Sequence, residues 1–345
     1  MKHSIPINSL DFNGTLRFLS DLHVPDNATS VEFDFKNLST VEPFGMLVAS
    51  RAISMLRADH GAIPFHAANF DNGAACSYAA HVGFFKTFGA KYGKEQGEAS
   101  GSSNYIPIHS CAVKELTDES EATGTRVGDQ LMTQARSLAS VLARSSEGSL
   151  HGLLAYSIRE VLRNIVEHSQ ALSYEYCAQY WPSKKKVEVA ILDRGIGLRK
   201  ALGANPFLKL TTDKEAIRWG LLPGISGKTY EGIYIDPHNP YQNSGFGLFL
   251  TSQLCRRHGT FVIGSYEALL GLKGNETHPY GFGFRGTAVR LVLQTDNLPS
   301  DIESLLRQII VDGEKMIEEI PHAVKVPNSA SKLLRGEFSR GTYSA

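Results

Sequence analysis

The sequence predicts an α/β protein with two domains, and three observations support this. The length of 345 residues suits two domains better than one. Strand-like and helix-like segments alternate in the N-terminal part of the chain, and a second such set follows a loop rich in Gly, Ser and charge at 92–104. We therefore place an N-terminal α/β domain at 1–115, a second α/β domain at 116–300, and a C-terminal helix and tail at 301–345.

The pattern of the first domain predicts strands and helices in alternation. The segment SVEFDFKNL (30–38) alternates apolar and polar residues, as a half-buried strand does. Residues 44–61 form an amphipathic pattern that Gly61 ends, which is typical of a helix. We expect a further strand at 63–70, a helix at 72–90 and one more strand at 105–113.

The second domain combines two long helices with a sheet. Apolar residues recur at helical spacing over 125–145 and 149–169. Apolar-rich strands at 174–181 and 186–193 flank a turn at Pro182–Lys185. Further along the chain we expect a helix at 247–258, strands at 258–272 and 286–294, a helix at 301–319 and a mobile tail over about the last twenty residues.

Composition and charge exclude several function classes. The 35 basic and 35 acidic residues balance, so nothing electrostatic favours nucleic acid or an anionic membrane as a partner. The N-terminus has no signal-peptide core and no apolar run is long enough to span a bilayer. The four cysteines are scattered without a CxxC pair, which favours reduced and mostly buried thiols, and the histidines form no HExxH or HxxxH cluster for a transition metal. We expect a cytoplasmic protein.

One helix carries a row of polar side chains beside its apolar side. Glu160, Asn164 and His168 fall within an arc of about 80° on the helix predicted at 149–169, and Glu167 lies beside them. The apolar stripe roughly 100° further round consists of Leu154, Ile158, Val161 and Ile165. The row therefore borders the buried side of the helix, as the wall of a pocket would.

Two glycine-rich segments resemble phosphate-binding motifs but fail the test of context. GISGKT (224–229) lacks the first glycine of a P-loop, because Leu222 stands there, and no strand precedes it. GFGFRG (281–286) spells GxGxxG, but a strand follows it where a dinucleotide-binding fold needs a helix.

Two other glycine pairs have a more informative context. Asp193 ends an apolar strand and is followed by Gly195 and Gly197, which either make an ordinary turn or form a cleft in which the carboxylate accepts a hydrogen bond from an amine. Gly245 and Gly247 open a helix, where they form either a flexible hinge or a site for an anion at the helix N-terminus. The residues alone leave both alternatives open.

Taken in order, these motifs resemble the GHKL, or Bergerat-fold, family of ATP-binding proteins. That family includes gyrase, mismatch-repair and heat-shock chaperone ATPases, histidine kinases and anti-sigma-factor kinases. The resemblance spans about residues 120–296 and implies an α/β sandwich in which helices cover one face of a mixed sheet. The matching positions are Glu160, Asn164 and His168; Asp193, Gly195 and Gly197; Gly245, Gly247 and Leu248; and Gly286 and Thr287.

The resemblance implies roles at the phosphate end of a nucleotide. Asn164 would ligate Mg²⁺, and Glu160 would be the catalytic residue that orients or deprotonates the attacking group. Gly245 and Gly247 would present N–H groups to the phosphates, with Leu248 following them. Family members often carry a further glycine where Asn243 stands here, which leaves the geometry of the phosphate loop open.

It also implies the adenine pocket and a lid. Asp193 would accept from the exocyclic amine of adenine with the support of Thr287, and Gly195 and Gly197 would form the floor of the pocket. His168, like Glu167, would shape the edge of the pocket. Residues 198–244 would be the lid, in which Lys228 either reaches a phosphate or is an ordinary exposed lysine.

The first domain resembles, more faintly, a STAS domain, the fold of anti-sigma-factor antagonists. The segments VEFDFKNLSTVEPFGMLVASRAISMLR and YAAHVGFFKTFG carry the resemblance, which a generic α/β domain would also explain. Phosphorylated STAS proteins have Ser or Thr just before the helix glycine, whereas Pro43 and Phe44 precede Gly45 here. Ser39 and Thr40 are nearby but out of register, so the phosphoacceptor is missing.

These resemblances lead to three hypotheses for function. The first is a regulatory protein that binds Mg-ATP, hydrolyses it slowly and alters its contacts with a partner when its lid closes. The second is a serine/threonine kinase of the anti-sigma type acting on a separate STAS-like protein, and the third is a non-enzymatic sensor of ATP occupancy. We expect the first, with ATP and Mg²⁺ as cofactors and the N-terminal domain as a protein-binding surface or a gate that takes a small ligand. Homodimerisation is common in the resembled family, and no sequence feature here decides it.

Overall fold

The computed structural model describes residues 1–234, 245–299 and 301–324. The chain divides into two compact units. Unit 1 comprises Met1–Ser110 together with Glu175–Gln179 and Glu188–Leu192, and unit 2 comprises Cys111–Tyr174, Tyr180–Val187 and the chain from Asp193 onward. The protein is thus of mixed α/β class, as the sequence predicts.

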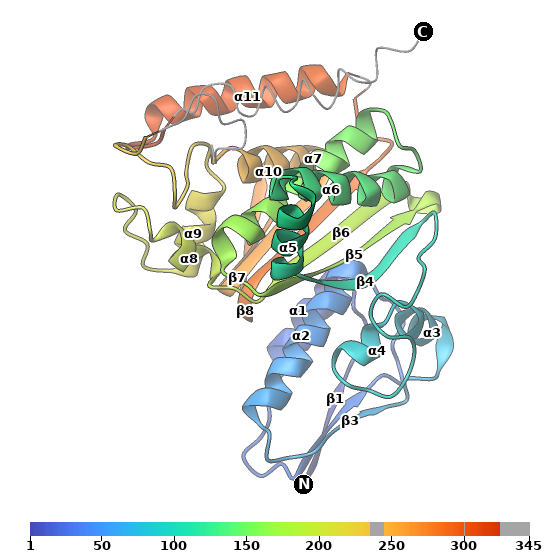
Figure 1. The fold of residues 1–345 in the computed structure, drawn as a ribbon. Coiled ribbons are helices and arrows are strands. Elements are labelled where there is room, and N and C mark those ends of the chain that lie inside the picture. The colour runs from blue at the N-terminus through green and yellow to red at the C-terminus, as the bar shows by residue number, and fades with distance from the viewer. Residues whose placement is uncertain (235–244, 300, 325–345) are drawn as a thin grey trace. The chain divides into compact units, whose positions relative to one another are not determined.

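Unit 1 contains a three-stranded parallel sheet of order β1-β2-β3 (Figure 1). Its helices lie between and after the strands, because parallel neighbours need crossover connections. Gly83, with φ of +92°, ends the helix predicted at 72–90 and starts a short second one, so that prediction of one helix is wrong. The elements are β1 (Lys2–Pro6), α1 (Phe12–Asp21), β2 (Ser30–Asp34), α2 (Pro43–Asp59), β3 (Phe65–Ala68), α3 (Gly73–His81) and α4 (Phe84–Thr87).

A five-stranded sheet has the order β4-β5-β6-β8-β7. Its strands are β4 (Tyr105–Ala112), β5 (Ser173–Trp181), β6 (Lys186–Asp193), β7 (Gly259–Lys273) and β8 (Glu276–Gln294). The strand expected to complete the first domain is β4, and it joins this sheet instead of the parallel one. At its end, Val113 N–H donates to the carbonyl of Leu172 at 2.9 Å, directly before β5.

Helices of unit 2 pack on each other and on the β7–β8 hairpin. The helix α6 (Val127–Ala143) packs along α7 (Ser149–Asn164), and α10 (Gly247–His258) packs on α7, β7 and β8 (Figure 1). The short helix α8 (Gly197–Leu202) and α9 (Asp213–Gly220) also contact β7. The remaining elements are α5 (Val113–Thr123), a five-residue π-helix (Ile165–Ser169), a 3₁₀ turn (Pro182–Lys184) and α11 (Ile302–Glu319).

The β7–β8 hairpin is longer than the sequence predicts. β7 and β8 pair antiparallel from Gly259 opposite Leu293 to Lys273 opposite Glu276, with β-bulges around Tyr266. The strand predicted at 286–294 therefore begins ten residues earlier, at Glu276. GFGFRG lies inside β8. Its phenylalanines alternate with glycines along the strand, and both are buried in the core, with Phe282 and Phe284 each 2% exposed.

Several local features match their sequence signals. All four cysteines are free thiols, and three of them are buried (Cys76, Cys177 and Cys255). Among the residues that the structure describes, no helix combines the length and the apolar character needed to cross a membrane. The tail expected after α11 falls mostly outside the described residues.

Candidate functional site

The helix α7 lies deep within unit 2. Every residue from His151 to Leu162 is buried, which includes Glu160 at 7% exposure. The apolar stripe predicted from the sequence is confirmed, since its four residues (Leu154, Ile158, Val161 and Ile165) are all buried. A carboxylate in such surroundings needs a charged or hydrogen-bonding partner.

Arg159 is that partner. Its guanidinium Nη2 forms a buried ion pair with Glu160 Oε1, and the same guanidinium lies 5.3 Å from the centre of the Tyr156 ring. The other oxygen, Oε2, lies against the first residue of α10, because a Cβ atom built on Gly247 would be 1.8 Å from it. Glycine at position 247 thus lets the N-terminus of α10 approach the Glu160 carboxylate.

The last five residues of the helix predicted at 149–169 form a π-helix (Ile165–Ser169) and not an α-helix, so the prediction of one regular helix is wrong. The π-helix begins directly after Asn164 and has more residues per turn than an α-helix. Gln170, with φ of +55°, ends the turn. Such π-turns are frequent at functional sites, where they re-aim side chains. Asn164 and His168 are both half-buried here.

Charged groups surround the π-turn. Arg163 Nε lies 2.6 Å from Glu167 Oε1, and the Nζ of Lys228 donates to the backbone carbonyl of Glu167. Burial lowers the pKa of His168 to about 4, with Lys228 and Arg163 acting in the same direction and Glu167 opposing them. His168 is therefore neutral at physiological pH, and Lys228, although exposed, lies beside the π-turn.

Asp193 ends β6 and is held by three hydrogen bonds. Gly195 N–H donates to Asp193 Oδ1 at 2.7 Å, and Thr287 donates through both its hydroxyl and its backbone N–H. Burial outweighs these bonds and raises the pKa of Asp193 to about 6. Gly286, with φ of +121°, lets β8 approach so closely that a Cβ there would be 2.0 Å from the Asp193 carbonyl. Asp193 and Thr287, which the resemblance places together at adenine, are thus hydrogen-bonded to each other.

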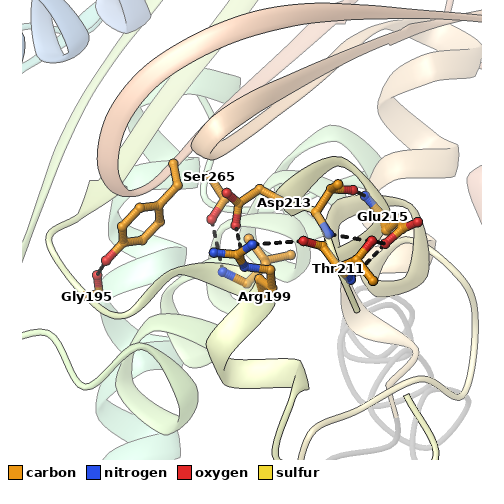
Figure 2. Close-up of polar contacts among 9 residues, drawn as sticks. Gly195, Arg199, Thr211, Asp213, Glu215 and Ser265 are labelled. Carbon is orange, nitrogen blue, oxygen red and sulfur yellow. Dashed lines mark hydrogen bonds and ion pairs between the residues drawn. The ribbon is translucent and has the colours of Figure 1, made fainter. Parts of the chain in front are cut away.

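The glycines after Asp193 dock on the π-turn and on β7. Ile196 N–H donates to the carbonyl of Ser169 at 2.8 Å, and a Cβ on Gly195 would be 2.1 Å from the same oxygen. Gly197 has φ of +72° and lies under the ring of Tyr266 (a Cβ would be 2.5 Å from it). The Tyr266 hydroxyl points to the carbonyl of Gly195 at 3.5 Å, as Figure 2 shows.

Gly245 and Leu248 lie at the start of α10. Gly245 has φ of +65°, and a Cβ there would be 2.6 Å from the backbone nitrogen and oxygen of Ile225. Leu248 is half-buried in the first turn of α10. Asn243 and the part of the predicted lid from 235 to 244 lie outside the described residues.

The helix α7 and the π-turn that follows it contact both the start of α10 and the loop after Asp193. Glu160 contacts the first residue of α10, and Ser169, nine positions later, contacts the loop that follows Asp193. Asn164 and His168 lie between these two points in the sequence. The site thus has an acidic acceptor at one end and a helix N-terminus at the other.

Sequence reasoning missed Arg159, Ser169 and Tyr266. Arg159 carried a usable signal, because a basic residue in the middle of an apolar helix and next to Glu160 predicts a buried ion pair. Ser169 and Tyr266 carried none, since a backbone carbonyl contact and a bulge in a strand depend on packing between distant segments.

Comparison with known proteins does not identify a relative. No model of a known protein family matches the chain, and no curated protein is significantly similar to it in sequence.

Proposed function

We propose that the chain is a cytoplasmic regulatory protein of Bergerat-fold type that binds Mg-ATP in unit 2 and hydrolyses it slowly. One observation carries the proposal: α7 and its π-turn connect the start of α10, at Glu160, with the Asp193 loop, at Ser169. A ligand that spans these points is elongated, hydrogen-bonding at one end and anionic at the other. ATP has this chemistry.

Asp193 supports adenine at the first end. A carboxylate offers about four acceptor positions on its two oxygens. Gly195 and Thr287 use three of these with their three donors. The remaining position suits the exocyclic amine of adenine. Asp193 is 2% exposed, so this hydrogen bond would form away from competing water.

The first turn of α10 supports phosphate at the second end. This helix has 12 residues, and the side chain of its N-cap residue, Phe246, makes no capping hydrogen bond. The N–H groups of the first turn and the helix dipole favour an anion. The Arg159 guanidinium offsets the charge of Glu160 beside them, so the carboxylate does not repel a phosphate as an isolated anion would.

Asn164 and Glu160 suit the metal and the hydrolytic step. The amide oxygen of Asn164 is the hard ligand that Mg²⁺ accepts, and it would hold the ion together with phosphate oxygens and water. The ion would neutralise part of the negative charge of the phosphates. Glu160, one helical turn earlier, would orient a water molecule and take up its proton. Lys228 on the described part of the lid adds a positive charge near the π-turn.

Unit 1 is proposed as a STAS-like surface for a protein partner. The position before the helix glycine is unsuited to a phosphoacceptor, because Phe44 is 1% exposed and its N–H donates to Glu188 Oε1 at 3.2 Å. A Cβ on Gly45 would be 1.9 Å from the Leu10 carbonyl, so α2 and the Leu10 segment meet closely. The partner would therefore bind elsewhere on unit 1, and a second copy of the chain is one such partner.

The experiment follows the γ-phosphate of labelled Mg-ATP with the full chain. We expect free phosphate from the wild type, a loss of about a hundredfold or more in Glu160→Gln, and no binding of Mg-ATP above background in Asn164→Ala. Glu119→Gln, on the exposed side of α5, is the matched control and should keep the wild-type rate. Label transferred to a partner protein would make the chain a kinase. Binding without turnover would make it an occupancy sensor, and a wild type that binds no ATP would overturn the proposal.

A further inference from the structure

We propose that Arg199 is a positioning residue that couples the adenine-binding loop to the lid helix α9. The inference rests on the proposed function, because it assigns α9 a role in holding the nucleotide. Arg199 lies in α8, directly after the Gly195–Gly197 loop, and its side chain reaches the segment that begins α9 (Figure 2). Its position within residues 198–244 places it in the expected lid, but no motif gives it a role of its own.

The start of α8, the helix that carries Arg199, is hydrogen-bonded to β7. Leu198 N–H donates to the hydroxyl of Ser265 at 3.0 Å, and Ser265 is fully buried. Next to it, the ring of Tyr266 covers Gly197. Tyr266 has φ of +50°, a strained value for an aromatic residue, which the bulge in β7 imposes. The start of α8 is therefore held in one position on the sheet.

The guanidinium of Arg199 contacts two groups at the start of α9. The Nη1 of Arg199 donates to the carbonyl of Thr211 at 3.0 Å, and its Nε lies 3.5 Å from Asp213 Oδ1. The Asp213 side chain is 4% exposed, whereas that of Arg199 is 49% exposed. A buried carboxylate in the first turn of a helix is favoured by the helix dipole. The positive charge of the Arg199 guanidinium, on the solvent side of Asp213, also stabilises this carboxylate.

The two groups that Arg199 contacts belong to a hydrogen-bonded segment at the start of α9. Thr212 and Glu215 form a capping box, and Glu215 Oε2 also accepts from the N–H of Thr211 at 2.9 Å and from its hydroxyl at 2.7 Å. The Thr211 carbonyl and the Asp213 carboxylate are thereby tied to the first turn of α9 (Figure 2). Arg199 therefore contacts two groups that are hydrogen-bonded into, or lie in, the first turn of α9.

The opposite end of α9 lies between α8 and the start of α10. A Cβ on Gly220 would be 3.0 Å from Leu198, 3.4 Å from Leu202 and 4.0 Å from Leu248. Leu198 follows the adenine-binding loop, and Leu248 stands in the first turn of α10. Thus α9 touches elements from both ends of the proposed nucleotide site. Its position, set by Arg199, affects how firmly both ends close on a ligand.

The test measures the release of a fluorescent ATP analogue from the full chain by stopped flow. We expect Arg199→Ala to speed release about five- to tenfold, the lower part of the range for coupled sites. Lys200→Ala, on the exposed side of the same helix, is the matched control and should leave the rate unchanged. Arg199→Lys keeps a charge near Asp213 but loses the planar fork, so its rate should lie between those of the wild type and Arg199→Ala.

Hydrogen exchange of the α9 amides without nucleotide separates this inference from the proposed function. We expect faster exchange over 213–220 in Arg199→Ala than in Lys200→Ala. Equal exchange in the two variants, or equal release of the analogue, would overturn the role of Arg199. If the wild type binds no analogue, the proposed function fails and the role in nucleotide release fails with it. The exchange data would then report only whether Arg199 positions α9.

Discussion

Asp193 is the residue at which the structure and the proposed chemistry meet most closely. Burial raises its pKa from the ordinary value of 3.8 to about 6, so the folded protein binds a proton there more tightly than the unfolded chain does. This group therefore stabilises the fold less as the pH rises from about 4 to about 7. The change corresponds to about 3 kcal/mol in the free energy of unfolding.

The variant Asp193→Asn removes this titration. We expect the free energy of unfolding of the variant, minus that of the wild type, to rise by up to about 3 kcal/mol between pH 4 and pH 7. Urea unfolding of both proteins at several pH values measures the difference. The comparison cancels other titrating groups such as His168, whose pKa of about 4 gives the opposite trend, since its folded state binds its proton more weakly. A difference that does not depend on pH would contradict the raised pKa.

The sequence marks Asp193 and Thr287 as candidates for one site, but it does not report the environment that sets the charge of Asp193. Asp193 and Thr287 stand at recognisable positions, at the end of a strand and after a late glycine. The burial of Asp193 depends on Gly286, whose lack of a side chain brings β8 onto the Asp193 carbonyl. That contact joins residues more than ninety positions apart, so no local pattern reports it.

At the scale of elements, Gly313 controls how α11 packs on α10. A Cβ at this position would be 2.6 Å from Phe249 and 2.9 Å from Phe246, the residue before the first turn of α10. In an unpacked helix, Gly→Ala is stabilising by up to about 1 kcal/mol. Here overpacking outweighs the helix propensity.

We expect Gly313→Ala to lower the free energy of unfolding by about 1–3 kcal/mol. The matched control is Gly61→Ala, where a Cβ meets open space. Thermal unfolding followed by circular dichroism measures both variants. A Gly313→Ala protein that is as stable as the control variant would mean that α11 does not pack on the two phenylalanines.

Most elements follow their sequence patterns, and the exceptions have physical causes. The helices at 125–145, 247–258 and 301–319 are confirmed as α6, α10 and α11. The helix predicted at 72–90 breaks because Gly83 adopts a positive φ, which an apolar pattern does not reveal. The π-turn at Ile165–Ser169 contacts the loop after Asp193 through the carbonyl of Ser169, and an apolar pattern does not report such a tertiary contact.

At the scale of the whole molecule, the candidate site lies within unit 2, but the five-stranded sheet includes β4, which precedes residue 115. The sequence suggested a boundary at 115 because the second helical pattern follows it. Membership of a strand in one sheet or another depends on non-local pairing, which periodicity cannot report.

We therefore expect a fragment that begins at Leu116 to fold poorly, because it lacks β4 and leaves β5 as an unprotected edge. The matched fragment begins at Asn104 and retains this strand. Expression of the two fragments, followed by circular dichroism and urea unfolding, compares them. Equal stability of the two fragments would show that β4 adds nothing to this sheet.

The proposed function requires unit 2 to bind Mg-ATP through Asp193 and the first turn of α10. Isothermal titration of the full chain with ATP, with and without Mg²⁺, tests it most directly. We expect saturable binding at one site per chain that strengthens with Mg²⁺, is lost in Asp193→Asn and is unchanged in Lys200→Ala. A wild type without binding, or binding that Asp193→Asn leaves intact, would contradict it.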